Sequence, residues 1–227
     1  MNNTTSTIHA HIVIIGINYR MDMLNILLQQ QSDDKWALPK YITNDIDALD
    51  TNIKQIVKTM TNINDLKISK INEFDKVENE LTVNHKVYLC IVPLNTTYTH
   101  SNKELWFDIS MILDPCYTDY ENRPNDIYFS DYNYHDDDMN TQSNMGSITA
   151  YTLIHIFHKI ANHDNITFLF LPDKFTLSDL HRVVEIITTV NLSMDELKHA
   201  YKNSMTAIRS KGKSLCENTI EQLYIAK

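Results

Sequence analysis

With 227 residues, 43 % of them hydrophobic and 9 % aromatic, the chain can bury one large core or two small ones. A formal net charge of −9 excludes a protein whose whole surface is basic, although it leaves room for a local basic patch. No segment approaches the ~18 apolar residues of a membrane span and no basic segment precedes the first apolar run, so we expect a cytoplasmic protein without a membrane partner.

The first half of the chain shows the patterns of several strands and one helix. Apolar runs predict strands at residues 9–18, 25–30, 66–74 and 86–94, and a short strand at 105–109 before a turn at 114–115. Residues 50–57 are instead amphipathic, with apolar side chains at 53, 56, 57 and 60, which predicts a helix between the second and third strands. This order predicts an α+β fold in which helices pack on a mixed sheet.

Residues 116–146 are rich in Asp, Asn, Tyr and Ser, and their centre reads Tyr134-His135-Asp136-Asp137-Asp138. Carboxylates beside a histidine could hold a cation, but the spacing fits no known ligand set, so a solvated acidic loop is the favoured interpretation. A helix is predicted at 147–163, where His155 and His158 could share a metal but are better explained as ordinary surface or core histidines.

The cysteines show no pattern of a structural or metal-binding kind. Cys90, Cys116 and Cys216 are far apart and lack the C-x-x-C spacing, which predicts neither a disulfide framework nor a zinc site. We therefore expect no bound metal and no cofactor.

The last sixty residues predict two helices and a hairpin. Thr176 and Asp179 can cap a first helix with apolar residues at 177, 180, 183, 184 and 187. After a turn at 191–192, residues 193–196 form a capping box for a second helix that runs to about Ile208. The inward positions of that helix are Leu197, Tyr201, Met205 and Ile208. Residues 209–213 are then predicted as a basic loop before a last strand at 222–225.

Residues 36–63 resemble the box of the Nudix hydrolase family without a gap. Residues 36–39 match its Trp-x-Leu-Pro lead-in, and Asp47 stands at the first glutamate position. The family's arginine-glutamate pair and its paired glutamates are replaced by Gln55, Ile56, Thr59 and Met60. Since these side chains give Mg²⁺ no anionic oxygen, the resemblance predicts a domain without catalytic residues that is not an enzyme.

Residues 168–180 resemble the junction of Nudix-related transcriptional regulators, where a short strand and a Leu-Pro-x-x-Phe-Thr-Leu-x-x-Leu run open a winged helix-turn-helix. The resemblance implies a ligand-sensing Nudix-like domain at 1–165, with its mixed sheet between helices, and a small winged-helix domain at 166–227. It also implies a homodimer, operator DNA as partner, and an effector that is an ADP-ribose-type nucleotide or a sugar.

Two groups of candidate site residues follow. Cations of the second helix and the basic segment could contact DNA phosphates: Lys198, His199, Lys202, Arg209, Lys211 and Lys213. Lys40 and Tyr41 replace the glycine pair after the Nudix lead-in, and Gln30 and Gln31 lie where relatives often carry Lys-Arg before the box. We therefore expect effector contacts at Gln31, Lys40 and Tyr41.

Two other functions stay open. Asp195 and Glu196 would repel phosphate at the start of the second helix, and residues 166–227 carry eight Lys or Arg against seven Asp or Glu. This favours a non-catalytic adaptor that acts through a protein partner without touching DNA. A residual hydrolase could instead use Asp45, Asp47 and Glu73 with the acidic loop.

Overall fold

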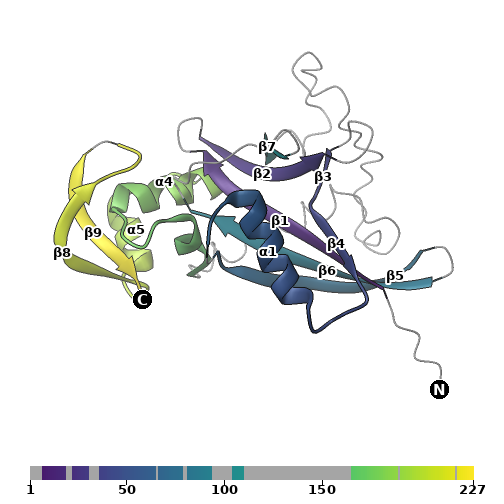
Figure 1. The fold of residues 1–227 in the computed structure, drawn as a ribbon. Helices are drawn as coiled ribbons and strands as arrows, with labels where there is room; N and C mark the ends of the chain where they lie inside the picture. Colours follow the sequence, from purple (N-terminus) through teal and green to yellow (C-terminus); the bar gives the residue numbers. More distant parts are fainter. Residues whose placement is uncertain are drawn as a thin grey trace, which may run out of the picture. The chain divides into compact units, whose positions relative to one another are not determined.

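The computed structural model describes residues 7–18, 22–30, 36–64, 66–78, 81–93, 104–109, 165–188, 190–217 and 219–227 (Figure 1). The predicted acidic loop, the turn at 114–115 and the helix predicted at 147–163 lie outside these residues, as do Gln31 and Cys116. Within them, no helix is long and apolar enough to cross a membrane. The described elements combine a sheet with helices, as the predicted α+β class requires.

Seven strands of the described residues form one sheet, whose order is β3-β2-β1-β6-β5, with β4 also paired to β1 and β7 to β2. Their bounds are β1 (Ile8–Asn18), β2 (Met23–Gln30), β3 (Trp36–Ala37), β4 (Lys40–Thr43), β5 (Ile68–Glu78), β6 (Leu81–Val92) and β7 (Glu104–Asp108). Strand β1 is buried along most of its length, as its near-continuous run of Ile and Val predicts. The predicted strands are confirmed, although β6 begins before Lys86 because residues 81–85 also pair antiparallel with β5.

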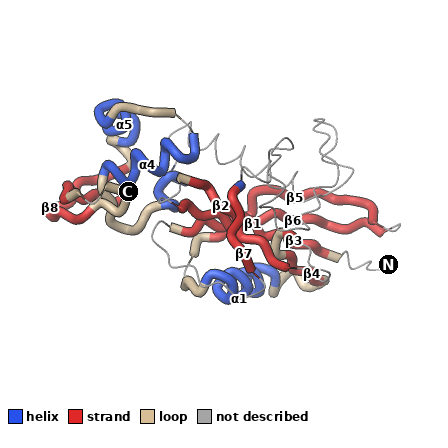
Figure 2. The backbone as a smooth tube through the Cα atoms, turned by 90° about the horizontal axis from the view of Figure 1, so that it is seen from above, coloured by secondary structure: helices blue, strands red, loops and turns tan. Residues whose placement is uncertain are grey.

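Helix α1 (Leu49–Thr61) lies along one face of this sheet (Figures 1 and 2). Its buried side chains recur at helical spacing, at Leu49, Ile53, Val57 and Met60, which confirms the predicted amphipathic helix. The helix ends at Asn62 in the left-handed conformation, with φ 55°, where the Nudix pattern has glycine. Asparagine is one of the few other residues that tolerate this conformation, so the stop signal of the box is kept.

The C-terminal elements are a 3₁₀ helix η3 (Asn165–Phe170), helices α4 (Leu177–Thr188) and α5 (Met194–Tyr201), and the paired strands β8 (Met205–Lys213) and β9 (Ile220–Ala226). Two predictions were wrong here. Residues 168–170 are helical rather than a strand, and the second helix ends at Tyr201 rather than near Ile208. Residues 205–213, including the predicted basic loop, pair with β9 instead, because the strand hydrogen bonds replace those of a continued helix.

An aromatic core holds these elements together. The Phe168 ring lies 5.5 Å from that of Phe175 and 5.7 Å from that of Tyr201, and the Tyr201 hydroxyl lies 3.0 Å from that of Thr167. Phe175 also exchanges both backbone hydrogen bonds with Tyr224 of β9, at 3.1 and 2.8 Å. Phe175, two residues before α4, thereby forms an isolated antiparallel bridge to the hairpin.

The chain separates into two compact units. One contains α1, β3, β4, β5 and most of β1, β2 and β6, and the other contains the C-terminal elements with Gly16–Asn25 and the end of β6. The boundary predicted between residues 165 and 166 therefore stays a prediction, since segments from the first half of the chain group with the second unit.

Candidate functional site

The box positions on α1 offer no carboxylate for a metal ion. Thr59 is exposed and its hydroxyl donates to the carbonyl of Gln55 at 2.9 Å, while Met60 is buried and Ile56 is half-buried. Across the described part of the chain, no group of three or more His, Cys, Asp or Glu side chains could hold a metal ion.

The carboxylates of the alternative hydrolase interpretation are engaged elsewhere. Asp45 accepts the backbone amides of Asp47 and Ala48 at 2.9 and 3.1 Å, which fixes the turn before α1. Glu73 lies on β5 and contacts two lysines. Neither arrangement brings the carboxylates together as a metal site.

The predicted effector residues Lys40 and Tyr41 lie next to each other on β4. Lys40 is exposed, whereas the half-buried Tyr41 accepts a hydrogen bond from the Asn52 side chain at 2.8 Å. This bond ties β4 to α1, and neither residue lines the two pockets described below. Their role as ligand contacts stays a prediction, as does that of Gln31.

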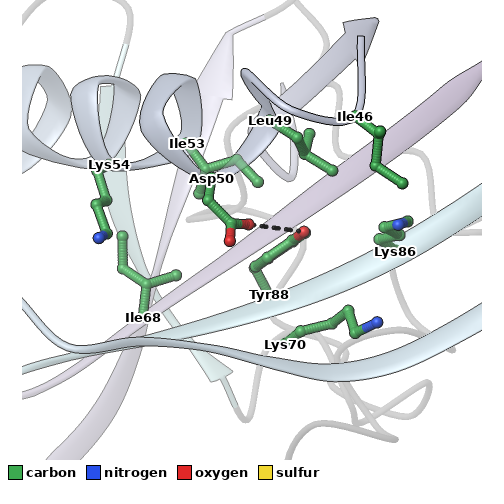
Figure 3. Close-up of a pocket in the computed structure, with 9 residues that line it drawn as sticks. All are labelled: Ile46, Leu49, Asp50, Ile53, Lys54, Ile68, Lys70, Lys86 and Tyr88. Atoms are coloured by element: carbon green, nitrogen blue, oxygen red, sulfur yellow. Dashed lines mark hydrogen bonds between the residues drawn. The ribbon is translucent and has the colours of Figure 1, made fainter. Parts of the chain in front are cut away.

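A pocket of about 350 Å³ opens between α1, β5 and β6 (Figure 3). It is lined by Ile46, Leu49, Asp50, Ile53, Lys54, Ile68, Lys70, Lys86 and Tyr88. Lys54 points from α1 toward Ile68, and the lysines of β5 and β6 lie on the other side of Asp50 and Tyr88 (Figure 3). Three lysines from three elements thus line the same pocket as Asp50.

Burial governs the chemistry in this pocket. The Tyr88 hydroxyl donates to Asp50 over a long 3.4 Å, and burial, reinforced by the Asp50 charge, raises the pKa of Tyr88 to about 12. The phenol is therefore protonated at neutral pH. The Lys86 side chain is only 8 % exposed, and its ammonium lies 3.5 Å from Glu73. The hydrogen bond from Lys70, followed by smaller effects of Asn84 and Lys86, lowers the pKa of Glu73 despite some desolvation.

A second pocket, of about 500 Å³, shares Lys54 and Ile68 with the first one. Lys58 and Gln55 are among its other lining residues. The two pockets therefore adjoin each other along α1.

Sequence reasoning did not select Lys54, Lys70, Lys86 or Tyr88. The alternation of side chains along a strand did place Lys86 and Tyr88 on one face, because side chains two residues apart share a face of a strand. Lys70 and Tyr88 are direct partners in the β5–β6 register, but this pairing depends on an irregularity between Lys70 and Asn72 that no sequence pattern revealed.

The predicted DNA contacts fall into two groups in the C-terminal unit. Lys198 and His199 lie on α5, with Lys202 just after its end, whereas Arg209, Lys211 and Lys213 lie on β8, and all six are exposed. No acidic residue occurs between Lys198 and Lys213. The structure therefore exposes all six cations within one acid-free segment, although that segment also contains the buried Tyr201 and Met205.

An irregularity in β8 surrounds Arg209. The register steps from Ala207↔Tyr224 to Lys211↔Gln222, which leaves extra residues on the β8 side. The Gln222 amide fills this bulge by donating to the carbonyls of Ile208 and Ser210, the latter at 3.1 Å. Bulges of this kind redirect the side chains they carry, and here the redirected side chain is a cation.

A buried carboxylate fastens the turn after β8 to α4. Asp179 is 1 % exposed and accepts from the Ser214 hydroxyl at 3.0 Å and from the amides of Leu215 and Cys216 at 2.8 and 3.3 Å. It also accepts the Thr176 amide at 2.9 Å, while the Thr176 hydroxyl accepts the Asp179 amide at 3.1 Å, so the predicted cap is confirmed. The sequence indicated the cap but not the link to the hairpin.

No protein-family model and no curated protein sequence matches the chain, but solved structures do. The crystal structure of Shewanella oneidensis NrtR complexed with a 27mer DNA aligns with 99 % of this chain and 94 % of that chain, at 14 % identity and a TM-score of 0.71. A MutT/nudix family protein from Enterococcus faecalis aligns with 100 % of this chain and 88 % of that chain, at 15 % identity and a TM-score of 0.65. At these identities the likeness establishes the fold, which agrees with the Nudix-like fold that the sequence resemblance implied.

Proposed function

We propose that this chain is a DNA-binding transcriptional regulator, in which a Nudix-like domain senses a nucleotide- or sugar-type ligand without hydrolysing it and a winged helix binds an operator. The observation that carries the proposal is the set of six exposed cations in the acid-free segment Lys198–Lys213, which spans α5 and the first strand of the hairpin. The fold likeness over nearly the whole chain to a protein solved with DNA supports it.

The charge distribution favours phosphate contacts from β8 and the end of α5 rather than from the start of α5. Asp195 and Glu196 are exposed in the first turn of α5. The Ser193 hydroxyl, and then its amide, lower the pKa of Glu196 by hydrogen bonding, so this carboxylate is ionised at neutral pH. Anions at this point repel phosphate, whereas the lysines and arginine that follow can neutralise it.

The box on α1 favours sensing over hydrolysis. A phosphate-bearing ligand can bind through lysines alone, but cleavage of a diphosphate in this family requires carboxylate-bound divalent ions. Ile56, Thr59 and Met60 give such ions no ligand. We expect the protein to work in the cytoplasm as a homodimer, which would present two recognition helices about one DNA turn apart.

The first experiment is affinity selection of fragments of the protein's own genome at near-physiological salt, followed by sequencing. Enrichment of a palindromic site is expected. Binding to that site should then weaken in the triple variant Arg209→Ala, Lys211→Ala, Lys213→Ala, and the slope of log affinity against log salt should fall by roughly 0.9 for each lost phosphate contact.

The matched control removes three exposed lysines outside the basic segment: Lys67, Lys174 and Lys227. This control should keep the salt slope of the natural chain. If the natural chain enriches no fragment, or if both triple variants behave alike, the proposal is wrong.

A second candidate is an adaptor protein that keeps both folds and acts through a protein partner. The exposed Asp195 and Glu196 at the start of the second helix favour it. A specific footprint on genomic DNA would eliminate this candidate, and a stable protein complex without any footprint would replace the regulator proposal.

A further inference from the structure

We propose that the pocket between α1, β5 and β6 binds a small phosphate ester, with its phosphate near Lys70 and Lys86 and its hydroxyl-bearing body against Asp50 and Tyr88. The proposal rests on the ligand-sensing part of the proposed function, since it assigns a binding site and a ligand class to the sensing domain. The binding step itself requires no DNA.

The lysines make this pocket locally cationic in an acidic chain. Lys54, Lys70 and Lys86 outnumber Asp50 and the adjoining Glu73, a balance of +1, whereas the whole chain has a net charge of −9. An anion is therefore attracted to this place more strongly than to the surrounding surface.

Lys86 is the residue that most strongly indicates a ligand. The Lys86 side chain is only 8 % exposed, and its ammonium carries three N–H donors. Its distance of 3.5 Å to Glu73 exceeds the ~2.7–2.9 Å of a charge-assisted hydrogen bond. Lys70 and Lys86 contact the two oxygens of one carboxylate, Glu73, so their ammonium groups lie close together, and the two cations outweigh that single anion where a phosphate oxygen would approach.

Asp50 and Tyr88 suit the uncharged part of such a ligand. Their mutual hydrogen bond is long, so a ligand hydroxyl inserted between them gains a donor and an acceptor at little cost. The carbon skeleton would lie against the apolar lining, Ile46, Leu49, Ile53 and Ile68. A polyol or sugar body offers both the hydroxyl groups and the carbon skeleton that these surfaces would contact.

Size and position separate this pocket from the decayed box. Its volume of about 350 Å³ is at the low end of the ~300–1,000 Å³ typical of ligand pockets, which fits a pentose phosphate better than a dinucleotide. At 3.6 residues per turn, Asp50 and Lys54 lie on a different side of α1 from Ile56 and Thr59. The pocket is thus distinct from the face on which Nudix enzymes carry their carboxylates.

The test is isothermal titration calorimetry of the full chain, in phosphate-free buffer with EDTA, using ribose 5-phosphate and ribose as probes. Ribose 5-phosphate should bind and ribose should not. Lys70→Ala should weaken binding by about tenfold or more, as expected for a lost charge-assisted contact, whereas Lys67→Ala, another exposed lysine, should leave it unchanged. Lys70 is itself about half exposed, so its loss should not unfold the chain.

Two further variants examine the hydroxyl side of the pocket. Tyr88→Phe and Asp50→Asn should weaken ribose 5-phosphate binding but should not change the weaker binding of inorganic phosphate. An equal loss for both probes would contradict the proposed orientation.

Absence of ribose 5-phosphate binding, or equal affinities of the Lys70→Ala and Lys67→Ala chains, would overturn the proposal. Tighter binding of ADP-ribose that is lost in Lys58→Ala would also overturn it, because the ligand would then span both pockets. If the chain binds the ester but no DNA, the regulator proposal is wrong and this inference stands. If it binds DNA but not the ester, this inference is wrong and the regulator proposal stands.

Discussion

Replacement of Asp179 by alanine is expected to release the hairpin from α4. The carboxylate accepts hydrogen bonds from four donors. The Thr176 amide and the Ser214 hydroxyl belong to buried residues, and the amides of Leu215 and Cys216 belong to half-buried ones. A hydrogen bond to a charged group contributes about 1.5 kcal/mol or more. The Thr176 amide caps α4 itself, so only the Ser214 hydroxyl is both buried and part of the hairpin turn, and it accounts for about 1.5 kcal/mol. Water can replace the carboxylate at the amides of Leu215 and Cys216.

A loss of about 1.5 kcal/mol raises the population of the opened hairpin by about tenfold. Hydrogen exchange followed by mass spectrometry should therefore show much faster exchange of the β8 and β9 amides in Asp179→Ala. Asp173→Ala removes an exposed carboxylate nearby and is the charge-matched control. Equal exchange rates in the two variants would refute the inference that Asp179 anchors the hairpin.

The other predictions concern single elements of the C-terminal unit. A Cβ at Gly212 would lie 2.8 Å from both methyl carbons of Leu223, so Gly212→Ala should displace that side chain, and Leu223→Ala in the same chain should abolish any change in melting temperature that the displacement causes. Since the pKa of Glu196 lies below its usual 4.5, the capping box stabilises α5 above that pH and loses its effect as the pH falls through the lower folded-state value. Glu196→Gln should remove this acid dependence, as measured by circular dichroism. Lys198→Ala with Lys202→Ala should weaken binding to all DNA sequences and flatten its salt dependence, and an unchanged slope would contradict their assignment as phosphate contacts.

The core elements could be predicted because their sequence signals are local. The apolar run of β1 requires burial on both faces, and the Ser193 and Thr176 caps need only residues three positions away. Such features do not depend on where the rest of the chain goes.

The errors arise where tertiary pairing outweighs local pattern. Tyr201, Met205 and Ile208 recur at helical spacing, yet β9 pairs with residues 205–213 and ends the helix at Tyr201. The pocket lysines escaped prediction for a related reason, since Lys70 meets Tyr88 only through the register of two strands. The sequence around a charged residue does not reveal which charged residues of other elements will lie beside it in the fold.

The left-handed stop at Asn62 lies at the glycine position of the Nudix pattern that residues 36–63 resemble, and that pattern combines two sets of positions. One set shapes the turn and the helix through conformational preference and burial, and it persists here in Asn62 and the apolar face of α1. The other set supplies the chemistry, and it has been replaced. A search that scores catalytic glutamates will therefore overlook chains of this kind, whereas one that weights turn-forming and buried positions can still detect them.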